Sequence, residues 1–273
     1  MLTIDRLTVQ LPHYPRWWRR EWTSCIDSLS LHLQTGDVHA VVGASGAGKS
    51  LLAYAILGLL PQPARVTGDV FFQGEKLTPT RQKRLRGHQL ALIPQSLNAL
   101  DPLARSQHQV RWAAQRVGLS RPDAQQRADG LLRRYQLDHA ATHYPHELSG
   151  GMARRVLIAM AQAGSACLVI ADEPSVGLDP IQRDRVLAAL KALAREGKTV
   201  LLITHDLRHA LNVADKVTVM RQGQALETAP AQAFQGQGEQ LTSDYARALW
   251  QALPDNAFTT YASPPQPMEP TLA

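Results

Sequence analysis

The sequence predicts an α/β fold built around a mostly parallel sheet that helices cover on both faces. The first observation is that strand-like and helix-like segments alternate in the second half, in the order "CLVIADE", "IQRDRVLAALKALAREG", "TVLLITHD" and "LRHALNVA". The second is that these strands are apolar runs rich in Val, Ile and Leu, which is typical of strands buried on both faces. With 273 residues, 44% of them hydrophobic, the chain can form one large domain, or one domain with a subdomain.

The first half of the chain contributes strands, a hairpin and one apolar helix. Residues 2–11 alternate apolar and polar side chains, which predicts an edge-type strand. A helix should run through the apolar residues 50–60, because Pro61 cannot continue it. The further elements expected here are strands at 29–33 and 38–42, a hairpin at 66–77 and a strand at 89–95.

The second half begins with a polar helical region. Residues 106–135 are rich in Gln, Arg and Ala, which suggests an inserted helical subdomain rather than part of a sheet. We therefore expect a main domain over residues 1–240, with the helical subdomain at about 100–150. A C-terminal extension should occupy residues 241–273. Roughly its last 20 residues are rich in Pro, Ser and Thr and poor in apolar residues, which predicts disorder.

The charge balance favours an anionic partner. Lys and Arg number 29 and Asp and Glu number 23, which gives a formal net charge of +6. A nucleotide, a nucleic acid or a lipid surface would suit this charge, and so would simple solvation of a basic surface. The two cysteines, Cys25 and Cys167, lack metal-ligand spacing and fit a reducing compartment. The sequence shows neither the apolar core of a signal peptide nor a run of about 18 apolar residues, so a membrane role would require a partner subunit.

The most specific motif is the glycine-rich segment 43–50, "GASGAGKS", which matches the pattern G-x-x-x-x-G-K-[ST]. It lies between an expected strand and an expected helix, which is the context that the motif requires. Its glycines let backbone N–H groups surround phosphates, and the helix that follows adds the positive end of its dipole. We expect Lys49 to reach the β- and γ-phosphates of a nucleotide and the Ser50 hydroxyl to bind Mg²⁺.

Polar side chains end three of the expected strands, at the edge where open α/β sheets bind ligands. Asp172 and Glu173 end "CLVIADE", His205 ends "LLITH", and Gln95 ends "LALIPQ". We expect Asp172 to hold Mg²⁺ through water. Glu173 points the other way along the strand, so it is free to orient and polarise an attacking water. His205 could bond the γ-phosphate or that water, and the Gln95 amide could ligate Mg²⁺.

The segment "HELSGGMARR", residues 146–155, places two glycines where a helix begins. Ser149 is a suitable helix cap, but a cap does not need Gly150 and Gly151 beside it. A helix N-terminus with two glycines offers bare N–H groups and a positive dipole end to a phosphate. The segment therefore predicts a second contact with phosphate.

Together these motifs resemble those of the ATP-binding-cassette (ABC) ATPases of transporters. The glycine loop, Gln95, "LSGGM", "VIADEP", "GLD" and His205 occur in that family's order over roughly residues 1–235. The resemblance implies a P-loop NTPase (RecA-like) core with an antiparallel β subdomain and an inserted α-helical subdomain. It also implies that two cassettes stack head to tail, so that "LSGGM" of one covers the γ-phosphate held by the glycine loop of the other.

The resemblance assigns roles residue by residue. Glu173 and His205 are the expected catalytic residues, and Ser50, Gln95 and Asp172 are the expected Mg²⁺ ligands. The expected contacts with ATP are Gly43, Ala44, Ser45, Gly46, Ala47, Gly48, Lys49, Ser50, Leu51, Gln95, Ser149, Gly150, Gly151, Met152 and Asp179, the last in a segment that crosses the interface between cassettes. An aromatic residue upstream of the glycine loop stacks on adenine in this family. The candidates are Trp17, Trp18 and Trp22, and a basic aromatic patch near the membrane is the alternative.

Details of the motifs resemble the peptide and nickel importers within the family. Met152 follows the two glycines where most cassettes have Gln. The segment "QSLNALDPL" resembles an S-x-N-P segment of these importers, with Asp101 before Pro102. The region "LGLLP…VTGDV" looks closest to nickel and metallophore importer subunits. The Cys-containing C-terminal extension of many peptide-type members is missing, which argues against an iron–sulfur cluster and against the dipeptide members.

The function implied by the resemblance is ATP hydrolysis, with ATP and Mg²⁺ bound, that powers uptake of a nickel or metal-chelate or peptide-type solute. The partners would be membrane permease subunits, a second ABC ATPase in a homo- or heterodimer and, indirectly, a solute-binding protein, at the cytoplasmic face of the membrane. The alternatives are an exporter subunit, a catalytically weak partner in a heterodimer and a nucleic-acid-associated ATPase. We expect no nucleic-acid partner, because the chain has neither a long coiled-coil insertion nor a second cassette.

Overall fold

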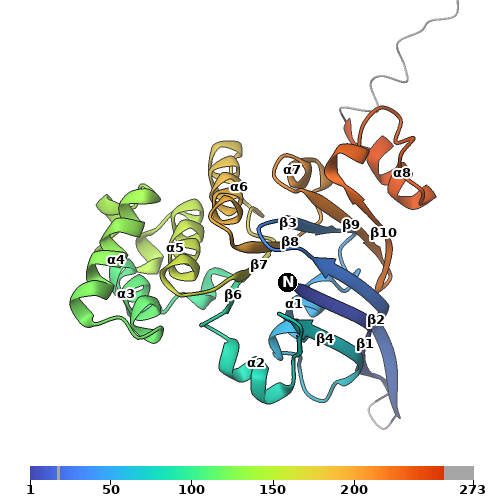
Figure 1. Cartoon of the computed structure of the whole chain (residues 1–273), viewed down its shortest axis with the longest axis horizontal. Helices are drawn as coiled ribbons and strands as arrows, with labels where there is room; N and C mark the ends of the chain where they lie inside the picture. The colour runs from blue at the N-terminus through green and yellow to red at the C-terminus, as the bar shows by residue number, and fades with distance from the viewer. Residues whose placement is uncertain (17–18, 255–273) are drawn as a thin grey trace, which may run out of the picture.

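The computed structural model describes residues 1–16 and 19–254, and a six-stranded sheet forms its centre (Figure 1). The strand order is β10-β9-β3-β8-β7-β6. The bounds are β3 (Val38–Val42), β6 (Leu90–Ile93), β7 (Leu168–Asp172), β8 (Thr199–Thr204), β9 (Lys216–Arg221) and β10 (Gln224–Pro230). All neighbours pair in parallel except β10, which runs antiparallel to β9 at one edge. The predicted α/β fold with a mostly parallel sheet is confirmed.

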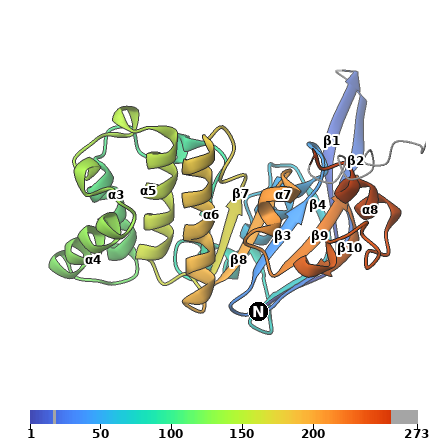
Figure 2. The ribbon, with the colours of Figure 1, turned by 90° about the horizontal axis from the view of Figure 1, so that it is seen from above.

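A second, antiparallel sheet has the order β2-β1-β4-β5. Its strands are β1 (Leu2–Arg16), β2 (Arg19–Leu33), β4 (Arg65–Phe72) and β5 (Glu75–Lys76). The prediction of an edge strand at residues 2–11 is wrong, because β1 pairs with β2 on one side and with β4 on the other. Its alternating pattern reflects instead a sheet with one buried face, to which Leu2, Ile4 and Val9 contribute. Figure 2 shows the hairpin of β1 and β2 extending away from the rest of the chain.

Helices pack on the sheets and form a separate end of the molecule. The α-helices are α1 (Lys49–Leu57), α2 (Pro79–Leu85), α3 (Ser106–Arg116), α4 (Arg121–Arg134), α5 (Gly150–Ala163), α6 (Pro180–Arg195), α7 (Leu207–Leu211) and α8 (Asp244–Gln251). The short 3₁₀ helices are η1 (Leu97–Ala99), η2 (Asp138–Ala140), η3 (Pro145–Glu147) and η4 (Ala231–Ala233). Helices α3, α4 and α5 lie together at the end opposite the β1–β2 hairpin (Figure 2). The expected helical region at 106–135 is thus occupied by α3 and α4, and the limits of the subdomain stay a prediction.

The six-stranded sheet divides the interior into two cores. Along β8, Val200 and Leu202 belong to the core that packs against α5, α6 and α7. Leu201 and Ile203 belong to the other core, which includes α1 and the antiparallel sheet. This division follows from the alternation of side chains along a strand, and it explains why the sequence of β8 is apolar throughout.

The part of the predicted C-terminal extension that the structure describes is folded. Helix α8 lies beside β10, and Leu241 and Ala246 are buried in the same core as α5 and α6. The boundary at residue 240 stays a prediction. The tail for which the sequence predicts disorder lies outside the described residues, as do Trp17 and Trp18.

Candidate functional site

The glycine loop joins the end of β3 to the start of α1, and its path excludes side chains at two positions. A Cβ on Gly43 would lie 2.1 Å from the carbonyl oxygen of Met220, and one on Gly48 would lie 2.4 Å from that of Cys25. Gly46 and Gly48 also adopt left-handed backbone angles, with φ of +80° and +93°. Because Met220 belongs to one sheet and Cys25 to the other, the loop is held between the two sheets.

Lys49, the first residue of α1, folds back over this loop. Its Nζ donates hydrogen bonds to the carbonyl oxygens of Gly43 at 2.7 Å and Ala44 at 3.0 Å. Burial lowers the pKa of Lys49, whereas the nearby carboxylates of Glu173 and Asp172 raise it. An ammonium group inside a loop at a helix N-terminus is an arrangement that binds phosphates.

Ser50 and Asp172 meet in front of the loop. The Ser50 hydroxyl donates to Oδ1 of Asp172 at 3.1 Å, and Asp172 is buried at the end of β7. Burial raises the pKa of Asp172, and the hydrogen bond from Ser50 opposes that shift. The two hard oxygen atoms fit Mg²⁺. In the described part of the chain no three His, Cys, Asp or Glu side chains gather into a metal site.

Glu173 is held by two hydrogen bonds from the neighbouring strand. Its Oε1 lies 2.9 Å from Nδ1 of His205, and its Oε2 accepts from the hydroxyl of Thr204 at 3.2 Å. Its backbone has a φ of +46°, an uncommon value for a residue with a side chain. The strained turn directs the side chain of Glu173 toward β8, while that of Asp172 faces α1. The two adjacent carboxylates thus face different elements. Because Glu173 follows the last residue of β7 and has a positive φ, the turn separates them rather than the alternation of side chains along a strand.

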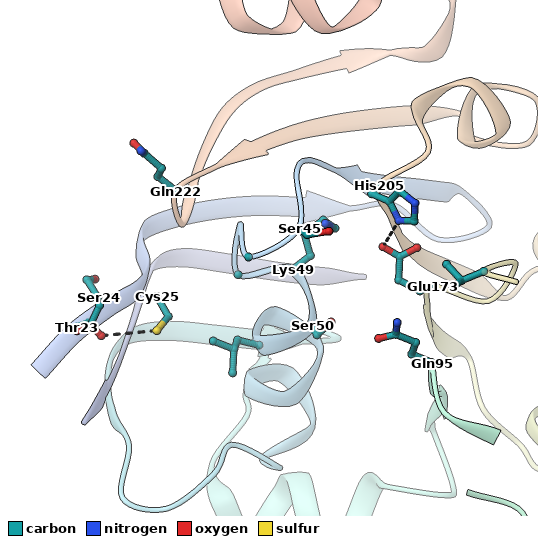
Figure 3. A pocket seen from close by; sticks show the side chains of 14 residues that line it. Thr23, Ser24, Cys25, Ser45, Lys49, Ser50, Gln95, Glu173, His205 and Gln222 are labelled. Carbon is teal, nitrogen blue, oxygen red and sulfur yellow. Dashed lines mark hydrogen bonds and ion pairs between the residues drawn. The ribbon is translucent and has the colours of Figure 1, made fainter. Parts of the chain in front are cut away.

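A cavity of about 700 Å³ lies beside the glycine loop, and Gly43, Ala44, Ala47 and Asp172 are not among the described residues that line it. Figure 3 shows Lys49 and Ser50 on one side, and Glu173, His205 and Gln95 on the other. The expected site residues in its wall are Ser45, Gly46, Gly48, Lys49, Ser50, Leu51, Gln95, Glu173 and His205. The structure therefore brings the glycine loop and the ends of three strands together, as the sequence predicts.

Ser149, Gly150, Gly151, Met152 and Asp179 are not among the described residues that line this cavity. Ser149 caps α5 through a bond of 3.3 Å from the Met152 N–H, and Asp179 caps α6 in the same way. Gly150 is exposed, with a single contact at 3.5 Å from an added Cβ, whereas a Cβ on Gly151 would lie 2.7 Å from Oε1 of Gln182. Packing within the chain thus explains the glycine at position 151, whereas Gly150 is exposed to solvent.

Five lining residues were not predicted. One is Val176, which follows Glu173 after β7, and the other four are Thr23, Ser24, Cys25 and Gln222. These four lie across the cavity from Glu173 and come from β2 and from the turn between β9 and β10 (Figure 3). No motif marks them, because their position depends on how the two sheets pack.

Trp22 is half-buried and is not among the described residues that line the cavity. The guanidinium carbons of Arg20 and Arg65 lie 4.3 and 4.0 Å from the centre of its ring. Trp22 therefore packs with two arginines at these distances.

Comparisons with known proteins identify the family. Residues 26–176 match the family described as ABC transporter. A probable peptide ABC transporter ATP-binding protein of Sinorhizobium fredii is 35% identical over 85% of this chain and 72% of its own length. The dipeptide transport ATP-binding protein DppD of Escherichia coli is 35% identical over 94% of this chain and 79% of its own.

Solved structures agree. The ATP-binding cassette MJ0796, described as a dimeric post-hydrolysis state bound to ADP and Pi, superposes with a TM-score of 0.74 at 25% identity over 85% of this chain and 99% of that one. The fold of cbiO1 from Clostridium perfringens is also similar, with a TM-score of 0.74 at 24% identity over 95% of this chain and 98% of that one. The chain therefore belongs to the ABC transporter family, as an ATP-binding subunit of the type to which the peptide transport ATP-binding proteins belong.

Proposed function

We propose that this subunit hydrolyses ATP in a paired arrangement of two cassettes and thereby drives uptake of a peptide-type solute through separate membrane subunits. The resemblance left a nickel or metal-chelate solute and a peptide-type solute open, and the names of the relatives favour the peptide-type solute. Among the helices of the described ranges, none has the length and apolar character to cross a bilayer.

The phosphates of ATP would lie over the glycine loop. Its N–H groups and Lys49 would bind them, and the ammonium group would exchange its bonds to the carbonyls of Gly43 and Ala44 for phosphate oxygens. Ser50, Asp172 and Gln95 would hold Mg²⁺, which when bound supplies charge neutralisation to the transferred phosphoryl group. These residues fit the ion by the oxygen chemistry of Ser50 and Asp172.

Glu173 and His205 would act on the attacking water. The Glu173 carboxylate is available at the cavity wall to orient the water and accept its proton. An ionised carboxylate only accepts hydrogen bonds, so the contact with His205 assigns a proton to Nδ1 of the imidazole. His205 thereby fixes the position of Glu173, and its half-exposed ring also reaches the cavity.

The observation that carries the paired arrangement is the position of Ser149 and Gly150. Both are exposed at the N-terminus of α5 and outside the wall of the cavity, so the chain's own nucleotide would not reach them. A second cassette facing this surface would place its phosphates against the helix N-terminus and the bare N–H groups. Met152 belongs to the first turn of α5, and Asp179 follows Leu178, whose side chain lies 3.5 Å from a Cβ added at Gly150. Both would complete that contact.

The test is the dependence of ATP hydrolysis on protein concentration. If two copies of the full chain must meet, the rate per subunit should rise with concentration and then saturate. ATP binding, measured without Mg²⁺, should not depend on concentration in this way. A rate per subunit that stays constant from nanomolar to micromolar protein would contradict the paired site, and absence of ATP binding would contradict the proposal as a whole.

Three further functions remain as alternatives. An exporter subunit would share the same ATP site, and so would a catalytically weak member of a heterodimer. Both differ from the proposal in their partners, and copurification with membrane proteins followed by their identification would separate them. Binding to nucleic acid at low salt would favour the nucleic-acid-associated ATPase instead.

A further inference from the structure

Arg154 lies one turn into α5, directly after the "LSGGM" segment, and it is 5% exposed. Its guanidinium donates to two successive backbone carbonyls at the end of β6. Nη1 lies 2.5 Å from the carbonyl oxygen of Pro94, and Nη2 donates to that of Gln95. A planar guanidinium with two charge-assisted hydrogen bonds fixes both the distance and the orientation of the segment that it binds.

The two ends of this contact belong to different parts of the proposed mechanism. The Gln95 side chain lines the chain's own nucleotide cavity. The turn of α5 that precedes Arg154 begins with the exposed Ser149 and Gly150. The N-terminal turn of α5 and the segment at Gln95 are distant in the sequence, with more than fifty residues between them. Arg154 is therefore a direct bridge from the N-terminal turn of α5 to the backbone that carries Gln95.

The charge on Arg154 is also placed near the site. Burial lowers the pKa of Arg154, and the Asp172 carboxylate acts in the opposite direction. The attraction between the two groups helps to keep a buried guanidinium charged. Removal of Arg154 would leave the carbonyls of Pro94 and Gln95 without this donor.

We propose that Arg154 is a positioning residue for ATP hydrolysis, which holds Gln95 in the nucleotide cavity and makes its position depend on that of the N-terminal turn of α5. The proposal rests on the proposed function, in which that turn contacts the nucleotide of a second cassette. A displacement of α5 must then move the carbonyls of Pro94 and Gln95 with it or break two charge-assisted bonds. One side chain thereby connects the nucleotide of this chain with the nucleotide that it covers in the partner.

A matched control is available in Arg81 of α2. Its Nη1 donates to the carbonyl oxygens of Phe72 at 3.1 Å and Glu75 at 2.6 Å. It is thus an arginine that binds two backbone carbonyls, and it is not among the described residues that line the cavity. Arg81→Met removes the same kind of contact at a place where it has no role in positioning Gln95.

The experiment compares the full-length wild type with Arg154→Met, Arg154→Lys and Arg81→Met. Three quantities are measured: the dissociation constant of ATP without Mg²⁺, kcat for hydrolysis, and amide hydrogen exchange over residues 94–99. We expect Arg154→Met to lower kcat about 10-fold or more, because misplacement of a contact group has effects of that size. ATP binding should change less than about twofold, since the glycine loop is intact. Exchange over residues 94–99 should become faster.

Arg154→Lys and Arg81→Met test whether the effect on kcat comes from the two hydrogen bonds of Arg154. Arg154→Lys should recover part of kcat, because an ammonium group can serve one carbonyl but not two in a fixed geometry. Arg81→Met should lower the melting temperature and leave kcat and exchange over residues 94–99 at the wild-type level. In a double-mutant cycle, Arg154→Met combined with Gln95→Ala should be no slower than Gln95→Ala alone, because the two residues act as one unit.

The proposal is overturned if Arg154→Met retains the kcat of the wild type, or if its effect adds fully to that of Gln95→Ala. Either result would give Arg154 a purely structural role. If Arg154→Met fails to fold, Arg154→Lys in the same cycle decides the question by the same criteria. A wild-type chain that binds ATP but does not hydrolyse it would instead contradict the proposed function, and unchanged exchange over residues 94–99 in the Arg154 variants would then still reject the positioning role.

Discussion

Glu173 Oε1 and His205 Nδ1 lie 2.9 Å apart, although the two residues come from the ends of different strands. The contact exists because β7 and β8 are parallel neighbours, so their carboxyl ends meet at the same edge of the sheet. It orients a carboxylate that the backbone, with its φ of +46°, already turns out of the strand. The geometry thus gives Glu173 one fixed direction into the cavity.

Glu173→Gln should retain ATP binding and lose hydrolysis. The amide keeps the size of the side chain but cannot accept a proton, and general-base catalysis is worth about 10²- to 10⁴-fold in rate. With ATP bound and not consumed, the closed pair of cassettes should accumulate, which size-exclusion chromatography in the presence of ATP and Mg²⁺ would detect. Undiminished phosphate release by this variant would remove Glu173 from the catalytic role.

Lys49→Ala should weaken nucleotide binding. It removes a charge-assisted bond to phosphate, and loss of such a bond corresponds to roughly a 10- to 100-fold higher dissociation constant. Isothermal titration with ATP measures the change. Lys83→Ala is the control, because Lys83 is an exposed residue of α2 and should leave binding unchanged. Equal affinities for the Lys49 variant and the wild type would count against the glycine loop as the phosphate site.

Gly150→Leu should leave ATP binding intact and block hydrolysis. Gly150 is exposed and has room for a Cβ within its own chain, so the larger side chain would obstruct the partner cassette without unfolding this one. Gly151→Leu is the contrast: its Cβ would lie 2.7 Å from Oε1 and 2.9 Å from Cβ of Gln182, so it should lower the melting temperature. If Gly150→Leu abolished ATP binding by the monomer, the intersubunit role of "LSGGM" would be wrong.

His39 should make the fold sensitive to acid. It is fully buried in β3, with Nε2 2.7 Å from the Thr218 hydroxyl and Nδ1 without a hydrogen-bond partner. Burial, with smaller contributions from Lys216 and His32, lowers the pKa of His39 from 6.5 to about 4. Between these values the unfolded chain binds a proton that the folded chain does not, so stability falls as the pH falls from 6.5 toward 4.

The size of this effect can be isolated with His39→Val, since Val suits a buried strand. At pH 5 the unfolded chain binds a proton at His39 and the folded chain does not. This difference lowers the free energy of unfolding by about 2 kcal/mol at pH 5 relative to pH 7. Urea denaturation at both pH values should show the wild type losing that much more than the variant. Equal losses in the two proteins would show that His39 accepts a proton as readily in the folded chain as in the unfolded one.

The sequence alone was sufficient to predict that the residues at the carboxyl ends of the parallel strands lie together. The segment before Asp172 and the segment before His205 are apolar runs, and their carboxyl ends must share an edge in a parallel sheet. The glycine loop is equally local, because its residues adjoin one another in the chain. Contacts of this kind need only the order of the elements, which the alternation of strand and helix provides.

Contacts between distant segments could not be predicted. Cys25 and Gln222 reach the cavity because the antiparallel sheet packs against the larger one, and no pattern in either segment encodes that packing. Arg154 binds backbone carbonyls, which every residue has, so its partners carry no sequence signature. The edge position predicted for residues 2–11 failed for a related reason: one-sided burial produces the same alternation at an edge and in the middle of a sheet.

The division of the interior by the six-stranded sheet has a consequence for how such a subunit can diversify. Leu201 and Leu202 are neighbours in the chain but pack into separate cores. Substitutions that change the size of side chains in the core beside α5, α6 and α7 therefore need not disturb the core beside α1, to which Met220 next to the glycine loop belongs.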